Sequence, residues 1–428
     1  MIRNPIPLAL TLSRPLRGIT SCRHLLAAVA LLSSAAIAVA QPFDDPRIDS
    51  ATGRDISVYA PDRLFDHLHM KLVVNIPTMA ESQFDGVETL TVTPIALPRT
   101  SLLLDAGDGL QFSTVTVNGS PATFVHKDAK LTIQFPQPIS VGQVATIVMT
   151  YHADNPGGRG KGFTWSKDYT RTPEEDFMFH SQGQPETNHL WFPCHDFPNE
   201  RLTTEIIATV PKGYEALSNG HIVEVKKFSD GRTRFHWLQD KTHTNYLVSL
   251  IVGKFDVVNV GGPNSKRPGL WMPVYGPLGS GDHIRESFSN TAEMVAVLEK
   301  LFDEPYPWDK YSQAIARNFA AGAMENTSCT TFADFAATGS GAFLEGIIVH
   351  ELGHQWFGDL VAYKGWEHTW LGEGWANYSE ALWAEHLGGE KGYQQAVLSN
   401  RRSETGAERW YPRFAGMATN RYKDPDDR

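Results

Sequence analysis

The stretch "GIIVHELGHQWFGD", residues 346–359, contains two histidines four positions apart and a glutamate beside the first. Residues four apart in a helix lie on the same side of its axis, so His350 and His354 can bind one metal ion from a single rigid element. Glu351 is the next residue, close enough to take a proton from a water beside that metal. The pattern predicts a zinc site with Glu351 as general base. The competing interpretation is a core helix whose histidines donate hydrogen bonds to carbonyls.

A catalytic zinc site needs a third protein ligand and one position left for water. Glu373, in "TWLGEGWANYSE", follows His354 by nineteen positions and begins the next predicted helix. A helix-loop-helix can therefore bring its carboxylate to the two imidazoles. Glu380 lies seven residues further, on the same helix face. We expect it either to accept a hydrogen bond from a ligand imidazole or to face solvent.

The chain before these residues has the pattern of β-structure, from about residue 44 to residue 260. One stretch places apolar residues at every second position, which predicts a strand with one buried face. These residues are Leu68, Met70, Leu72, Val74 and Ile76. The dipeptide Asn118-Gly119 between two strand-like runs is a hairpin signal. Several short strands of this kind predict a large antiparallel sheet domain.

Glycine, proline, asparagine and serine gather at residues 260–269 and indicate a boundary loop. Beyond it the apolar spacing becomes helical. The first predicted helix has core residues from Ile284 to Phe302, among them Phe288, Val295 and Leu298, and Pro305 ends it. The second covers 342–357 and carries the two histidines, with Gly358 as its cap. The third begins near Glu373 and stops at Gly388-Gly389.

A further motif, Gly-Ala-Met-Glu-Asn at residues 322–326, precedes the histidine motif. With H-E-x-x-H and the later glutamate, it resembles the aminopeptidase N-like zinc metallopeptidases. "WFPCHDFPNERLTTEI", residues 191–206, also resembles the family's segment that ends the substrate-binding sheet domain. The resemblance covers about residues 60 to 400. It implies an α+β multidomain fold, in which a saddle-like antiparallel β domain precedes a thermolysin-like, mainly helical catalytic domain.

We accordingly divide the chain into a signal peptide at 1–40, a β-rich substrate-binding domain at 41–262 and a zinc peptidase domain at 263–428. The resemblance also implies roles for single residues. Zinc ligands are implied at His350, His354 and Glu373, and the general base at Glu351.

The resemblance implies substrate contacts as well. Glu325 corresponds to the glutamate that holds the free α-amino group of the substrate, and Gln184 to a residue that contacts the same amine. Gly322 and Ala323 correspond to the backbone strand along the substrate. A protonated amine is stabilised by a carboxylate, and a peptide offers that amine at its terminus. We therefore expect a zinc-dependent aminopeptidase with one zinc ion, acting on peptides with a free N-terminal amine.

The sequence departs from the family pattern near the ligands. Gly372 and Trp375 stand where many members have Asn and Phe, and Asp359 stands where Asn is usual. Neither Tyr411 nor Tyr422 has the Tyr-x-Lys-Gly-like context of the family's oxyanion tyrosine, and we expect the sequence to be truncated. The alternative function is a zinc- and peptide-binding fragment with little or no turnover. A hydrolase of the leukotriene epoxide hydrolase branch is a third interpretation.

The first forty residues have the order of an export signal. They contain four arginines and no acid, then an apolar run at 25–39, then the small-x-small pattern Ala38-Val39-Ala40. We expect a periplasmic or secreted protein whose mature form does not span the membrane. An uncleaved anchor is the alternative.

The composition is that of a globular protein, with 428 residues, 41% hydrophobic and 20% charged. The formal net charge of −10 argues against a nucleic-acid partner, because phosphate binding needs basic patches. Cys194 and Cys329 are expected to be free and buried, although a single disulfide between them is the other possibility.

Overall fold

The computed structural model describes residues 48, 51–54, 57–158, 160–167, 177–338 and 342–410. The predicted signal peptide and both C-terminal tyrosines lie outside these ranges. The chain separates into two compact units, residues 1–56 and 57–428, and the strands and helices named below belong to the second. Within the described ranges, none of the helices combines the length and the hydropathy that a bilayer crossing requires.

Three sheets form the β-rich part of the described chain. The eight-stranded sheet has the order β14 (His221–Lys227), β15 (Thr233–Thr244), β12 (Arg201–Val210), β1 (Phe65–Asn75), β2 (Gln83–Pro94), β8 (Ala145–Asp154), β4 (Leu110–Val117) and β5 (Ser120–Pro121). A five-stranded sheet has the order β13 (Glu215–Ser218), β16 (Leu250–Gly253), β11 (Phe177–Gln182), β10 (Lys161–Lys167) and β9 (Gly157–Gly158). A three-stranded sheet consists of β3 (Arg99–Asp105), β7 (Lys130–Ile139) and β6 (Thr123–Lys127).

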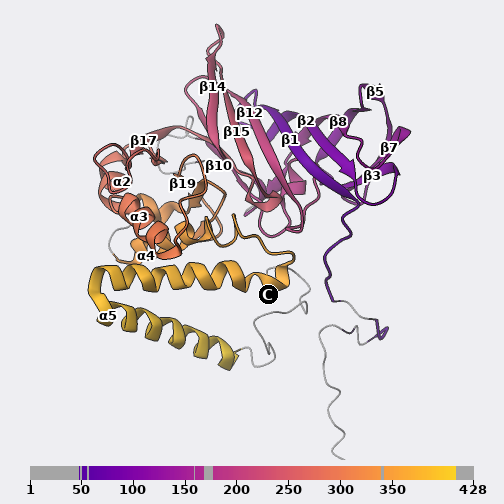
Figure 1. Ribbon diagram of the computed structural model, residues 1–428. Helices are drawn as coiled ribbons and strands as arrows, with labels where there is room; N and C mark the ends of the chain where they lie inside the picture. The colour runs from indigo at the N-terminus through magenta and orange to yellow at the C-terminus, as the bar shows by residue number, and fades with distance from the viewer. Residues whose placement is uncertain are drawn as a thin grey trace, which may run out of the picture. The chain divides into compact units, whose positions relative to one another are not determined.

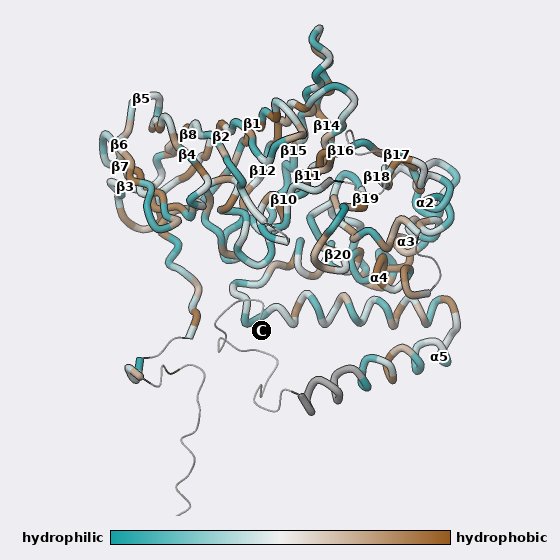
Figure 2. Tube along the Cα trace, turned by 180° about the vertical axis from the view of Figure 1, so that it is seen from behind, coloured by the Kyte–Doolittle hydropathy of each residue, from teal (hydrophilic) through white to brown (hydrophobic). Residues whose placement is uncertain are grey.

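The predicted alternation along β1 is present, with one exception. Met70, Leu72, Val74 and Ile76 are buried, but Leu68 is 37% exposed. The pairing of β1 with β2 shifts register between His67 and His69, and such a bulge turns the residue within it to the other face. The prediction for Leu68 was therefore wrong. Figure 2 shows hydrophilic and hydrophobic residues alternating along these strands.

The large sheet is antiparallel except where β1 pairs in parallel with β12. The predicted hairpin joins β4 to β5. Asn118 and Gly119 have φ angles of 51° and 77°, and positive φ at both central residues is the requirement of a type I′ turn. The hairpin prediction is confirmed.

A mixed sheet and several helices form the remainder of the described part of the unit. The sheet has the order β17 (Phe255–Asn259), β18 (Pro273–Pro277), β19 (Ser312–Ile315), β21 (Cys329–Phe332) and β20 (Ala323–Met324). The helices among the described residues are α2 (Gly281–Ser287), α3 (Thr291–Phe302), α4 (Ala342–His354) and α5 (Trp370–Trp410). Short 3-10 turns are η1 (Asn188–Leu190), η2 (Asn245–Leu247), η3 (Asp334–Ala337) and η4 (Trp366–His368). Strands β17 and β18 lie on either side of residues 260–269 and pair with each other, so this loop connects two strands of one sheet. The domain boundary that we place at residue 262 stays a prediction.

The helices differ from the predicted ones at their ends. The predicted helix from Ile284 to Phe302 is two helices, α2 and α3, although Ile284, Phe288, Val295 and Leu298 are all buried as expected. The ligand helix α4 ends at His354, four residues before Gly358, whose φ is 128°.

The first helical segment of α5 ends at the predicted glycine pair. Gly389 has non-helical angles, φ 59° and ψ −158°, so the helix is interrupted there and a second helical segment runs on to Trp410. Figure 1 shows α5 folding back at this bend. A positive φ costs glycine little, so Gly389 can end the first segment, and the predicted stop is confirmed.

A buried lysine ties the β-rich part to the mixed sheet. Lys310 Nζ donates to Ser218 O at 2.8 Å and to Ser328 O at 3.1 Å, and it lies 5.1 Å from the ring centroid of Trp237. An unpaired buried ammonium would be strongly destabilising, so these acceptors fix strand β13 against the segment before β21. Cys194 and Cys329 are free and buried, as predicted.

Candidate metal centre

Helices α4 and α5 position the three predicted ligands. Leu344, Ile348, Val349 and Leu352 anchor α4 in the core. A Cβ atom at Gly353 would lie 2.5 Å from Ser379 Oγ and 3.0 Å from Ser379 Cβ. Glycine therefore allows α5 to approach α4 closely, between the two histidines of the motif. This approach brings the carboxylate of Glu373 to the imidazoles of His350 and His354.

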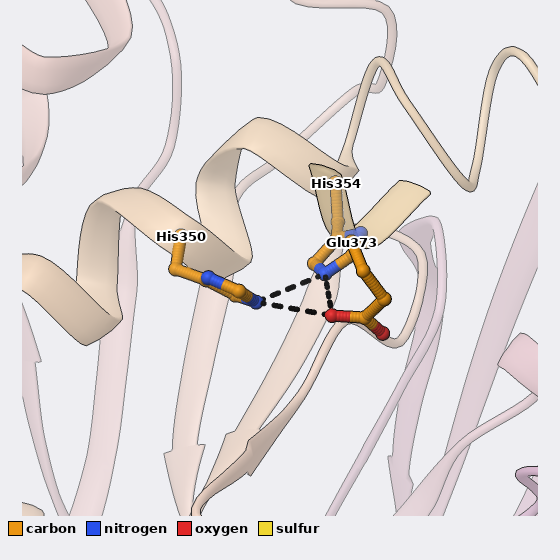
Figure 3. A group of neighbouring side chains, drawn as sticks. All are labelled: His350, His354 and Glu373. Atoms are coloured by element: carbon orange, nitrogen blue, oxygen red, sulfur yellow. Dashed lines mark hydrogen bonds and ion pairs between the residues drawn. The ribbon is translucent and has the colours of Figure 1, made fainter. Parts of the chain in front are cut away.

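The three ligand atoms converge on one point (Figure 3). The Nε2 atoms of His350 and His354 are 3.2 Å apart, and Glu373 Oε2 is 3.5 Å from the first and 3.7 Å from the second. Tetrahedral zinc with bonds of about 2.0–2.1 Å separates its ligand atoms by about 3.3 Å. Two nitrogens and one oxygen at these separations fit zinc, and the fourth tetrahedral position is left for water or substrate.

The other nitrogen of each imidazole is held by a second group. His350 Nδ1 donates to Glu380 Oε1 at 2.9 Å, and His354 Nδ1 donates to the backbone oxygen of Phe357 at 3.1 Å. These bonds fix the tautomer in which Nε2 carries the lone pair that a metal needs. Of the two expectations for Glu380, the structure supports the hydrogen bond.

The ligands are strongly coupled by charge. Burial lowers the pKa of His350, but the hydrogen bonds with Glu373 and Glu380 outweigh burial and raise this pKa to about 9. Burial likewise opposes the shift at His354, where Glu325 and Glu373 raise the pKa well above its usual value. Burial raises the pKa of Glu373, yet the two histidines hold it far below the usual range. The raised pKa values of the two histidines show that the surrounding carboxylates favour positive charge at this point, as a metal cation would supply.

Glu351 lies beside the predicted ligands, and one of its two carboxylate oxygens is unpaired among the described residues. Its side chain is buried, and among the described residues Oε2 has no hydrogen-bond partner. Burial raises the pKa of Glu351 to about 8, although His350 and His354 lower it. A carboxyl group with a pKa near neutrality can accept and return a proton at physiological pH.

Glu325 places a second carboxylate beside the ligands. It is only 3% exposed, and its Oε1 accepts a hydrogen bond from Tyr246 OH at 3.3 Å. The hydroxyl of Tyr246 also lies 2.9 Å from that of Tyr363. Burial raises the pKa of Glu325, whereas His354 lowers it. An anionic group held here can bind a cationic group of a ligand that reaches the metal.

The other predicted substrate residues have different environments. Ala323 pairs with Phe332 in the β20–β21 hairpin, and Gly322 O accepts from Ala333 N at 3.0 Å. Gln184 Nε2 is buried, and no partner for it exists among the described residues. The structure gives no contact of Gln184 with the three ligands, and the roles of these residues stay predictions.

Sequence reasoning missed Tyr246 and Gln355, which both contact Glu325. Tyr246 lies 79 positions before Glu325 in the chain, and no local pattern connects the two. Gln355 directly follows the second histidine and is fully buried. A polar residue next to a predicted ligand in an apolar helix was a signal that could have identified it.

This β-rich part followed by a helical part with a three-ligand metal centre defines a class of metallopeptidase fold. The model of the peptidase M1 N-terminal domain matches residues 66–247, and that of the peptidase family M1 domain matches residues 286–414. The chain therefore belongs to peptidase family M1.

Individual relatives agree with this assignment. The chain is 29% identical to human aminopeptidase B over 304 residues, 70% of this chain and 43% of that protein. It is 27% identical to aminopeptidase M1 of Arabidopsis thaliana over 333 residues, 73% of this chain and 36% of that protein. The chain thus spans less than half the length of these two relatives.

Solved structures give a similar result. The M1 zinc metallopeptidase from Deinococcus radiodurans matches with a TM-score of 0.67 and 27% identity, covering 80% of this chain and 76% of that one. A variant of the Deinococcus protein bound to a Tyr-Ser-Ala substrate matches with a TM-score of 0.67 and 26% identity, over 81% and 76% of the two chains.

Proposed function

We propose that this chain is a zinc-dependent aminopeptidase that removes N-terminal residues from peptides. The observation that carries the proposal is the convergence of His350, His354 and Glu373 on one point with the buried carboxylates of Glu351 and Glu325 beside it. The names of the M1 relatives support the same activity. A metal and an anionic anchor in one site suit a substrate with a free amine close to the bond that is cut.

The residues have separate tasks in this reaction. His350, His354 and Glu373 would hold zinc, which when bound polarises the scissile carbonyl and activates water. Glu325 binds the protonated α-amine of the substrate and thereby places the first peptide bond at the metal. Glu351 takes a proton from the attacking water and passes it to the leaving amine.

Hydrolysis of aminoacyl anilides by the zinc-loaded chain tests the proposal. We expect chromophore release in the unmutated protein and its loss in Glu351→Gln, with zinc content unchanged. The matched substitution Glu88→Gln changes a buried glutamate on β2, far along the chain from the site, and should keep activity. Zinc uptake without turnover in the unmutated chain would refute aminopeptidase activity and favour the zinc- and peptide-binding fragment.

The role of Glu325 has its own test. Glu325→Ala should weaken the handling of free-amine substrates more than the binding of zinc, because the side chain is an amine anchor and not a ligand. Equal loss of metal and activity would contradict that assignment.

We also propose that the protein is exported. The support is the arginine-containing leader, the apolar run and the small-x-small pattern before Gln41. Mass spectrometry of the protein from its source organism should find a mature chain that begins at Gln41. An N-terminus upstream of the apolar run would contradict export by cleavage.

A further inference from the structure

The side chain of Gln355 connects the ligand helix to the segment that carries Glu325. Gln355 Oε1 accepts from the backbone N–H of Ser328 at 2.8 Å and from Tyr306 OH at 3.2 Å. Its Nε2 donates to the backbone oxygen of Glu325 at 3.1 Å. The residue is fully buried. One amide therefore contacts both ends of the four-residue segment 325–328.

This segment has a fixed shape that the amide can recognise. Cys329 N donates to Asn326 O at 2.8 Å, and Ser328 has a φ of 59°. The backbone oxygen of Glu325 and the N–H of Ser328 consequently face the same partner. Because the amide of glutamine offers one acceptor and one donor in one plane, it satisfies both groups as a neighbouring strand would.

Other bonds hold the segment from the opposite side. Asn219 Nδ2 donates to Thr327 O at 2.7 Å, and Asn326 Nδ2 donates to Leu247 O at 3.3 Å. These partners belong to the β-rich part of the unit. Gln355, in contrast, is the residue directly after His354, at which the ligand helix ends. The position of Glu325 relative to the metal ligands therefore depends on a contact made by the residue that is bonded to one of those ligands.

We propose that Gln355 is a positioning residue, which sets the spacing between the carboxylate of Glu325 and the metal centre. The inference rests on the proposed function, in which the α-amine and the scissile carbonyl of one residue must be bound at once. That requirement fixes the spacing to within a fraction of an ångström, since the two groups are separated by a single Cα atom. The side chain of Gln355 contacts the backbone of Glu325, and its own backbone is bonded directly to His354, a predicted metal ligand.

The test compares two inhibitors on the zinc-loaded full chain. L-Leucine hydroxamate has the α-amine, and isocaproyl hydroxamate is the same molecule without it. Both bind metal through the hydroxamate. The dissociation constant of isocaproyl hydroxamate divided by that of L-leucine hydroxamate therefore measures the contribution of the amine. In Gln355→Met, which removes the donor and the acceptor at nearly constant volume, we expect this ratio to fall about tenfold. Zinc stoichiometry and the affinity for isocaproyl hydroxamate should not change.

A matched control is Gln313→Met. Gln313 is also fully buried, on β19, and its Nε2 donates to Thr291 Oγ1 at 3.4 Å. This variant loses a buried amide but should keep the wild-type ratio. If Gln355→Met does not fold, Gln355→Asn keeps the amide one methylene short of both partners and should lower the ratio in the same way.

The outcomes separate the inference from the function on which it rests. An unmutated chain that binds both hydroxamates equally would refute the amine anchor and the inference with it. An unmutated chain that prefers leucine hydroxamate, with the preference fully kept in Gln355→Met or Gln355→Asn, would refute the positioning role alone. If the ratio of dissociation constants falls in Gln313→Met as well, the effect is a general one of buried amides. That result would also refute the positioning role of Gln355.

Discussion

Helix α4 approaches helix α5 closely at Gly353, and Gly353→Ala tests the importance of this contact. In an isolated helix this change is favourable by about 0.5–1 kcal/mol, because alanine loses less backbone entropy than glycine. In this protein the new Cβ would meet Ser379 Oγ at 2.5 Å, Ser379 Cβ at 3.0 Å and Ala376 Cα at 3.4 Å. The hydroxyl can rotate away, but the Cβ and Cα atoms are fixed to the backbone of α5. Helix α5 must therefore move by a few tenths of an ångström.

The expected size of the effect follows from these contacts. Overpacking of a close helix contact costs about 1–3 kcal/mol, which exceeds the gain in helix propensity. Glu373 and Glu380 are on the displaced helix, so a ligand and the partner of a ligand move together. Disturbance of such supporting contacts typically lowers metal affinity about 10–100-fold. We expect Gly353→Ala to weaken zinc binding by about tenfold and to lower the free energy of unfolding of the metal-free protein by about 1 kcal/mol.

The assay is zinc competition with a chromogenic chelator, combined with urea unfolding of the metal-free protein. Gly346→Ala is the matched control, because Gly346 lies two turns earlier on the same face of α4 and its new Cβ would meet only Glu380 Oε2 at an ordinary 3.8 Å. The control should gain stability and keep zinc affinity. If Gly353→Ala behaved like Gly346→Ala in both measurements, the argument from helix spacing would be refuted.

Three further predictions concern charge. Glu380→Ala removes the acceptor for His350 Nδ1 and should lower zinc affinity about 10–100-fold in the same competition assay, and unchanged affinity would contradict the orienting role. Zinc uptake should release protons, because His350 has a pKa of about 9 in the protein without metal and must be neutral to bind. The apparent affinity for zinc should consequently rise between about pH 6 and 8. Calorimetry in buffers of different ionisation enthalpy can measure the proton release, and a zinc affinity that does not change with pH would contradict this prediction. Glu88 is fully buried with both carboxylate oxygens unpaired among the described residues, and burial raises its pKa well above the usual value. Glu88 then ionises at a lower pH in the unfolded chain than in the folded one, so it lowers the free energy of unfolding as pH rises above about 4. Glu88→Leu should therefore stabilise the folded protein by about 1–3 kcal/mol at neutral pH and by less in acid. Equal effects in urea unfolding at both pH values would contradict the sign.

The fold could be predicted from sequence where the signal is local. The alternation in β1 and the Asn118-Gly119 turn depend on neighbouring residues, and both predictions agree with the structure except at Leu68. That residue faces outward because of a register shift against β2, and the partner strand is not identifiable from the sequence of β1. The predicted stop at Gly388-Gly389 also rests on a local signal and is confirmed. Glycine adopts the positive φ that ends a helix at little cost, whereas the helical segment after Gly389 was not predicted.

Residues of the candidate site, too, could be predicted where their signal is local and not where it depends on tertiary packing. The spacing of His350 and His354 on one helix determines that their side chains meet, so the sequence alone predicts the pair. Glu373 needed the additional expectation of a helix-loop-helix. Tyr246 could not be assigned, and the place of Gln355 beside His354 does not reveal its partner, because their contacts with Glu325 join parts of the chain 79 and 30 positions apart. Such contacts follow from tertiary packing, which no local pattern in the sequence encodes.

The buried ammonium of Lys310 has a consequence for chemical footprinting. Acylating reagents attack an unprotonated amine, and burial lowers the pKa of this lysine to about 8, although Cys329 and Asp309 oppose the shift. The group is nevertheless shielded, because it is fully buried and its acceptors lie on Ser218 of β13 and on Ser328, just before β21. Labelling at Lys310 would therefore proceed at the rate at which these two segments separate. A time course of its acetylation, read by mass spectrometry, would report this local opening in the folded protein.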